Sequence, residues 1–167
     1  MTPAADREEL ITRYLAADDY TPALTWRLLD WCMARGADAL TLDPMRMVGR
    51  PSPACDAFET RMAPHRLADG ERRPLGAPYE QWREPAELWR LDAASAAILR
   101  EHLELGLFTY LLDPENGWLE DPALYRGREL MLGVVTHEGE GFLRVTAGER
   151  AELDGLGFPT RDAGTWI

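Results

Sequence analysis

The first third of the chain has apolar residues at helical spacing. After Thr2-Pro3, an N-cap residue followed by the proline favoured at the first helical position, they recur at Leu10, Ile11, Tyr14 and Leu15. The same start signal returns at Thr21-Pro22, and the apolar stripe behind it consists of Leu24, Leu28, Trp31 and Cys32. We therefore expect one helix over residues 3–16 and a second from residue 22 to a stop at Gly36.

The next segment, residues 37–78, is interrupted repeatedly by prolines and glycines, which favour turns over continuous elements. Within it, Ser52-Pro53 is a start signal that predicts a short helix through Phe58 and Met62. The remainder of the segment is expected to be an ordered or partly mobile loop. A loop of this length is uncommon in a compact domain and often functional, although its composition indicates no particular chemistry.

A second helical region is predicted after this loop. Pro85 divides the aromatic stretch 79–89 into two short helical pieces, because proline interrupts a helix. Asp92 is then a good N-cap for a stronger helix whose apolar stripe comprises Ala96, Leu99 and Leu103. This helix is expected to end near Gly106.

Beyond that helix the apolar pattern changes toward the two-residue period of strands. Three segments are rich in strand-forming residues: 107–112, 129–136 and 142–145. The last two flank five residues that include two glycines, so they predict a hairpin. Thr146 and Glu149 then match a capping box and predict a final short helix that ends at Gly155.

The order of these elements predicts an α+β fold, with N-terminal helices packed on a small C-terminal antiparallel sheet and a short final helix. The length of 167 residues fits a single domain over residues 1–167. Its helical part spans about 1–106 and its strand-rich part about 107–167. The hydrophobic fraction of 46% is enough to build a core.

Charge is unevenly distributed along the chain. The net charge is −11, of which −8 falls in residues 101–167. Nucleic acid is therefore an unfavourable partner, because binding it requires basic residues that displace counterions from phosphates. Every strongly basic residue is Arg, and the absence of Lys excludes a Walker A phosphate site and Schiff-base catalysis.

Residues that could carry catalysis or bind a metal show no recognisable spacing. The histidines, His65, His102 and His137, lie far apart in the sequence and share no zinc-binding motif. The acidic turn 113–120 departs from the pattern of a calcium loop. Of the two cysteines, Cys32 lies on an apolar stripe, Cys55 is more exposed by its pattern, and two thiols are too few for a disulfide framework. We predict no catalytic residue, no metal site and no cofactor, and a reduced pair of cysteines.

The acidic C-terminal part instead predicts a surface for a basic protein partner. The candidate partner-binding residues are Glu101, Glu104, Asp113, Glu115, Trp118, Glu120, Asp121, Tyr125, Glu138 and Glu140. Acidic immunity and antitoxin proteins neutralise basic toxins through surfaces of this kind, by electrostatic steering and aromatic contacts.

Three alternatives remain for this acidic part. The acidity could serve solubility alone; the chain could be a small enzyme or ligand-binding protein that uses scattered carboxylates, with or without a metal; or it could be an acidic mimic of nucleic acid. The N-terminus lacks the features of a signal peptide, and no segment has the length of a membrane span. We therefore expect a cytoplasmic protein without a membrane partner.

Overall fold

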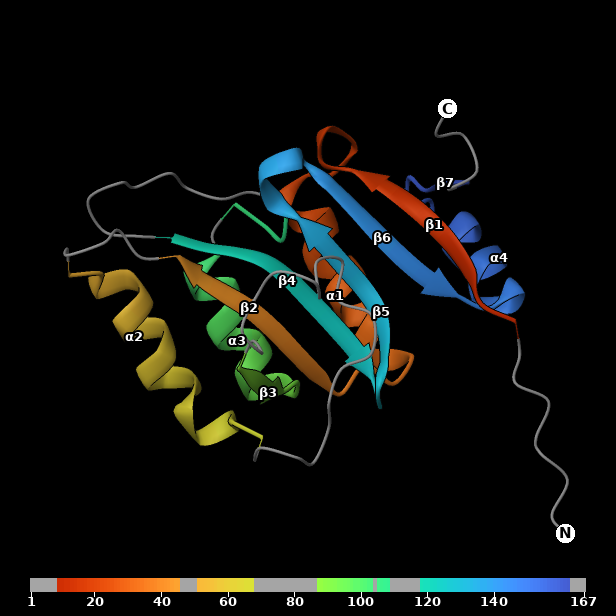
Figure 1. Ribbon diagram of the computed structural model, residues 1–167. Helices are drawn as coiled ribbons and strands as arrows, with labels where there is room; N and C mark the ends of the chain where they lie inside the picture. Colours follow the sequence, from red (N-terminus) through yellow and green to blue (C-terminus); the bar gives the residue numbers. More distant parts are fainter. Residues whose placement is uncertain (1–8, 46–50, 68–86, 104, 109–117, 163–167) are drawn as a thin grey trace, which may run out of the picture.

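A seven-stranded antiparallel sheet forms the centre of the part of the chain that the structure describes (Figure 1). The computed structural model describes residues 9–45, 51–67, 87–103, 105–108 and 118–162. The strands are β1 (Ile11–Ala16), β2 (Ala39–Met45), β3 (Leu88–Arg90), β4 (Trp118–Arg126), β5 (Glu129–Val135), β6 (Glu140–Val145) and β7 (Arg161–Asp162). Their spatial order is β3-β2-β4-β5-β6-β1-β7, so the early strand β1 lies between the two latest strands.

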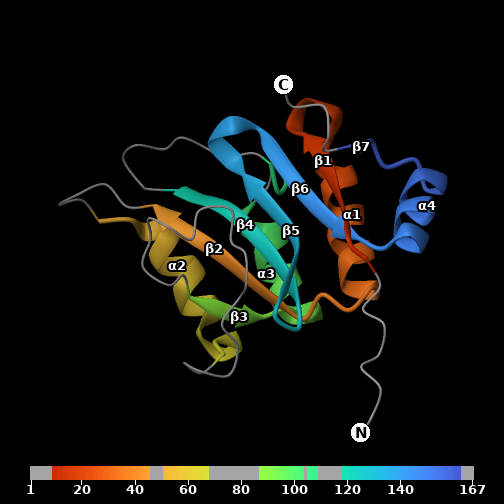
Figure 2. The same ribbon diagram turned by 45° about the vertical axis from the view of Figure 1, so that its right-hand side comes forward.

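Helices cover one face of this sheet. The α-helices of the described ranges are α1 (Pro22–Ala34), α2 (Pro53–Met62), α3 (Ala93–His102) and α4 (Ala147–Gly155). Single turns of 3-10 helix follow at η1 (Ala17–Asp19), η2 (Ala63–His65) and η3 (Thr136–Glu138). Figures 1 and 2 show α1 and α3 behind the central strands, α2 near the β2 side and α4 near the β1 side.

The main core lies between the sheet and these helices. It includes Leu28 and Cys32 from α1, Phe58 from α2, Leu99 from α3 and a row of leucines and valines from the strands. A smaller buried cluster consists of Ala39, Leu88, Ala123, Tyr125 and Leu130. Because successive strand residues point to opposite faces, this second cluster lies on the other face of the sheet.

The predicted arrangement of helices followed by a C-terminal sheet is wrong. Strands are spread along the chain, and the sheet has seven of them in the described part. The expected helix over residues 3–16 is instead β1 for residues 11–16, and residues 3–8 lie outside the described ranges. The helical pattern was misleading because Arg13 points inward beside Leu15, at 5% and 0% exposure, which concealed the period of two.

Two further strands replace predicted loop and helix. β2 occupies part of the segment expected to be a loop, and Pro44 near its end had argued against a strand. β3 contains Trp89, which was expected in a helical piece; residues 79–86 of that stretch are outside the described ranges. The expected strand 107–112 is not one at Leu107 and Phe108, which form a turn, and its other residues are not described.

Helices with clear capping signals are confirmed. Thr21 caps α1 by accepting a hydrogen bond from the Leu24 amide at 3.2 Å. Asp92 caps α3 through bonds from two amides, those of Ala94 and Ser95, both at 2.9 Å. The capping box of α4, the helix α2 and the β5–β6 hairpin are also present where they were expected.

Candidate functional site

An irregularity in β4 shapes the end of the sheet that carries half of the eight predicted acidic residues. β2 pairs Thr41 with Ala123 but Asp43 with Glu120, so two residues of β4 face a single residue of β2. This is a β-bulge, in which the extra residue leaves the ladder and the strand bends. Asp121 is at the bulge and has a positive φ of 51°, a conformation that aspartate adopts more readily than most residues.

Thr136, which directly follows the neighbouring strand β5, holds this bulge in place. The Asp121 amide donates to the Thr136 hydroxyl, and the Thr136 amide donates to Asp121 Oδ1, both at 2.8 Å. Thr136 is the first residue of η3 and is 4% exposed. The two bonds therefore link β4 to η3 and restrict the orientation of the Asp121 carboxylate.

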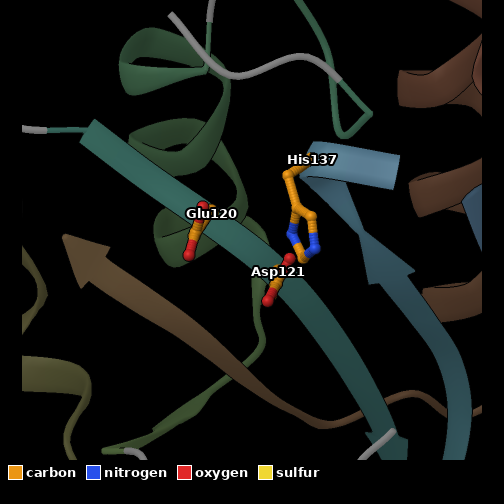
Figure 3. Close-up of side chains that lie close together, drawn as sticks. All are labelled: Glu120, Asp121 and His137. Carbon is orange, nitrogen blue, oxygen red and sulfur yellow. The ribbon is translucent and has the colours of Figure 1, made fainter. Parts of the chain in front are cut away.

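The bulge brings three ionisable side chains together (Figure 3). One potential ligand atom from each of Glu120, Asp121 and His137 lies within 4.8 Å of the other two. In Figure 3 the His137 ring reaches from η3 toward Asp121, with Glu120 one residue along β4. Glu120 is buried, Asp121 is half-buried and His137 is exposed, so the group runs from the protein interior to its surface. In the described ranges, this is the set of side chains suited to hold a metal.

More acidic residues lie at the same end of the sheet as this group. The Ala17 amide donates to the Gly139 carbonyl at 2.8 Å, which places η1 beside the turn that follows η3. η1 contributes Asp18 and Asp19, η3 contributes Glu138, and Glu140 is the first residue of β6. Figure 1 shows the η1 and η3 turns at the same end of the sheet. We call the whole set the acidic rim: Asp18, Asp19, Glu120, Asp121, Glu138 and Glu140.

Two aromatic side chains adjoin the acidic rim. Tyr14 of β1 and Phe142 of β6 face each other across the strands, with ring centroids 6.1 Å apart in an edge-to-face arrangement. Both are half-buried. Partial desolvation raises the pKa of Tyr14, as do its hydrogen bond to Glu140 and the charges of Glu140 and Asp19. The phenol therefore remains protonated and donates to the rim.

Comparisons of the chain with protein-family models, with curated proteins and with solved structures give no match. The geometry of the chain itself is therefore the basis for assigning a function. In the described ranges, no helix combines the length and the apolar character that crossing a membrane requires.

The structure brings together four of the ten predicted partner-binding residues, Glu120, Asp121, Glu138 and Glu140. Glu101 lies elsewhere, at the end of α3, where it is exposed and pairs with Arg61 of α2. That pairing lowers the pKa of Glu101. Tyr125 is 1% exposed within the smaller cluster, so its ring offers no surface to a partner.

The side chains of the four remaining predicted residues lie outside the described part of the chain. Glu104, Asp113 and Glu115 lie outside the described residues. Trp118 begins β4, and only its backbone is described.

Sequence reasoning missed several members of this region. His137 is remote from Glu120 in sequence, and Asp18 and Asp19 belong to a segment far from the acidic C-terminal part. One signal was available: Asp121-Pro122 inside a strand indicates an irregularity, because proline interrupts the ladder. The partners across the bulge depend on strand pairing, which a local pattern does not reveal.

Neither cysteine is placed for nucleophilic chemistry. Cys32 and Cys55 are not joined by a disulfide, and both are 0% exposed, so the expected exposure of Cys55 is wrong. Burial raises the pKa of the Cys32 thiol, which disfavours the thiolate. Cys55 faces the core from the first turn of α2, between the exposed residues Ala54 and Asp56.

Proposed function

We propose that this chain is a protein-binding module of the immunity or antitoxin type, which neutralises a basic partner protein through the acidic rim. The observation that supports this proposal is the convergence of acidic residues from three separate segments, η1, β4 and the η3 turn, at one end of the sheet. Folding thus concentrates negative charge that the sequence distributes widely.

The arrangement suits electrostatic recognition. Asp18 and Glu138 are exposed, whereas Asp121 and Glu140 are half-buried and backed by the sheet. A basic side chain that reaches the half-buried carboxylates meets less water than at an open surface, so its attraction is screened less. Arg161 pairs with Asp19 at 2.6 Å. A partner's arginine would make contacts of the same type with the other carboxylates of the rim.

The half-buried pair of Tyr14 and Phe142 adds an apolar contact next to the acidic rim. Aromatic residues beside complementary charges are common in the energetically dominant parts of interfaces. The proposed interface therefore combines steering by the carboxylates with an aromatic anchor. It replaces the aromatic role that Tyr125 was expected to have, because that ring is buried.

The proposal is tested by charge reversal. The chain is co-expressed with the product of the gene next to its own, and complex formation is measured by surface plasmon resonance at low and high salt. The double variant D18R/E138R is expected to lower the association rate constant by about tenfold and to weaken its salt dependence. Both side chains are exposed, so the fold should tolerate the change.

A matched control reverses two charges elsewhere. D56R/E59R changes the net charge equally but on α2, away from the acidic rim. It is expected to retain most of the wild-type association rate. Equal effects of the two double variants would show that only net charge matters and would overturn the rim as the binding surface, and absence of any salt-sensitive complex would overturn the proposal for that partner.

A further inference from the structure

The group formed by Glu120, Asp121 and His137 has a composition that the rest of the acidic rim lacks. It combines two carboxylates with an imidazole, and its members come from two segments that the Thr136 hydrogen bonds hold together. Imidazole nitrogen and carboxylate oxygen together are a ligand set for divalent transition metals. A solvated patch of acids needs no such nitrogen donor.

Distances in the group are close to those of a metal site. The ligand atoms lie within 4.8 Å of one another. Zinc bonds of about 2.1 Å in a tetrahedral site separate two ligand atoms by about 3.4 Å. The three groups would therefore close in by at most about 1.4 Å, as the difference between the 4.8 Å limit and that spacing indicates. The exposed His137 side chain is able to make most of this movement by rotating about its side-chain bonds.

Electrostatics also favours a cation at this position. Glu120 and Asp121 are adjacent carboxylates, and Glu138 lies 3.8 Å from His137 Nε2. Neighbouring carboxylates such as Glu120 and Asp121 repel one another, and a divalent ion bound by both converts the repulsion into attraction. Glu120 is 6% exposed, so water screens its side of the site weakly.

The surroundings orient one of the ligands. The Thr136 amide donates to Asp121 Oδ1 at 2.8 Å, so this carboxylate is fixed before any ion arrives. Hydrogen bonds of this kind to metal ligands raise affinity, because less ordering is needed on binding. The bulge supplies the same benefit through the backbone, since it turns Asp121 toward η3.

We propose that Glu120, Asp121 and His137 form a binding site for a divalent transition-metal ion, with zinc favoured over manganese. Three protein ligands leave at least one position for water or another ligand. The order of affinities follows from the donors: the imidazole favours zinc over manganese, and both over calcium or magnesium. The proposal is independent of the partner-binding function, because it concerns the chain alone.

Isothermal titration calorimetry of the full chain with zinc chloride tests this inference. We expect binding of one ion per chain, weaker binding of manganese, and no measurable binding of calcium or magnesium at the same concentrations. H137A, E120Q and D121N should each weaken zinc binding by at least about tenfold. Affinity should also fall as the pH is lowered, because protons compete for the ligands.

The control and a direct readout separate this site from non-specific binding. E138Q removes a neighbouring charge but no proposed ligand, so it should retain zinc binding to within a few-fold. Zinc should shift the imidazole nitrogen resonances of His137 in NMR spectra and leave those of His65 and His102 unchanged. If zinc binds equally to wild type and H137A, or does not bind at all, the proposal is overturned.

The variants differ in their demands on the fold. His137 is exposed, so H137A should fold like wild type, and circular dichroism checks this. If the buried E120Q fails to fold, H137A and D121N still decide the question. A wild-type chain that binds zinc but no basic partner would contradict the proposed function alone. A wild-type chain that binds the partner but no zinc would contradict this inference alone.

Discussion

His102 is the last residue of α3, and its partly buried, titratable side chain contacts α2. Its ring contacts Phe58 edge-to-face at a centroid distance of 5.5 Å, and Arg61 Nη1 lies 3.5 Å from its Nε2. Burial lowers the pKa of His102, and the charge of Arg61 lowers it further, against a smaller opposing effect of Glu101. The folded chain therefore favours the neutral imidazole.

This lowered pKa predicts a loss of stability in mild acid. Above the ordinary imidazole pKa of about 6.5 the ring is neutral in both the folded and unfolded states, and its contribution is fully present. As the pH falls from about 6.5 to the lower pKa of the folded state, the unfolded chain binds the proton more readily than the folded chain does. The free energy of unfolding therefore decreases over this range. We expect H102Q to reduce the difference between the free energies of unfolding at pH 7 and pH 5, measured by urea denaturation. An unchanged difference would contradict this assignment.

Asp121 shows what can be predicted at the level of a single residue. Its charge led to its prediction as a partner-binding residue, and it is one of the residues of the acidic rim, but its backbone role was not visible in the sequence. The positive φ, the bulge and the bonds to Thr136 all depend on how β4 pairs with its neighbours. Residue type thus indicated the chemistry of the region, whereas its geometry required the sheet.

At the scale of elements, helices were predicted better than strands for a physical reason. A helix is hydrogen-bonded and capped by residues close in sequence, and the signals at Thr21, Asp92 and Thr146 were all correct. A strand gains its partners from distant segments. β2 is buried on both faces, with Leu40 at 0% and Thr41 at 7% exposure, so it lacks the alternation by which a half-exposed strand is recognised.

The capping box of α4 gives a prediction for an element. The Glu149 amide donates to the Thr146 hydroxyl at 3.2 Å, and the Thr146 amide donates to Glu149 Oε2 at 2.9 Å. T146A removes the first bond and should lower the free energy of unfolding by about 1 kcal/mol. T146S keeps the hydroxyl and should remain close to wild type. Thermal or urea denaturation measures both, and equal losses in the two variants would rule out a capping role.

At the scale of the whole molecule, the order of the strands in the sheet could not be predicted from the sequence. β1 pairs with β6, and β2 with β4, so most of the sheet joins segments that are distant in sequence. The acidic rim has the same origin, because Asp18, Glu120 and Glu138 lie at one end of the sheet only when β1, β4 and β5 are in place. Composition correctly indicated acidity, yet the location of the rim is a property of the assembled sheet.

Arg13 connects three parts of this assembly. Its Nε donates to Thr160 Oγ1 at 3.0 Å and its Nη2 to the Thr160 carbonyl at 2.9 Å, while Nη1 pairs with Asp162 of β7. Nη2 also lies 3.8 Å from Asp154 of α4. At 5% exposure, this guanidinium is an internal junction between β1, β7 and α4.

Replacement of this junction should weaken the whole molecule. R13M is expected to lower the free energy of unfolding by about 2 kcal/mol, because it removes the hydrogen bonds that the buried guanidinium donates to Thr160. Hydrogen exchange should also accelerate over residues 158–162. R150M provides the control: Arg150 lies 3.4 Å from the same Asp162 but is 39% exposed, so we expect a loss below about 1 kcal/mol. If the two variants lost the same stability, the junction would have no special role.

The position of β1 between β6 and β7 also determines when the sheet can be completed during translation. Residues 11–16 are synthesised early, but both of their sheet neighbours are made only after almost the whole described chain. During translation this segment must wait with its backbone hydrogen-bonding groups unpaired by β6 and β7. Completion of the sheet is therefore a late event. In a chain interrupted before residue 140, the segment that forms β1 has neither of its neighbouring strands to pair with.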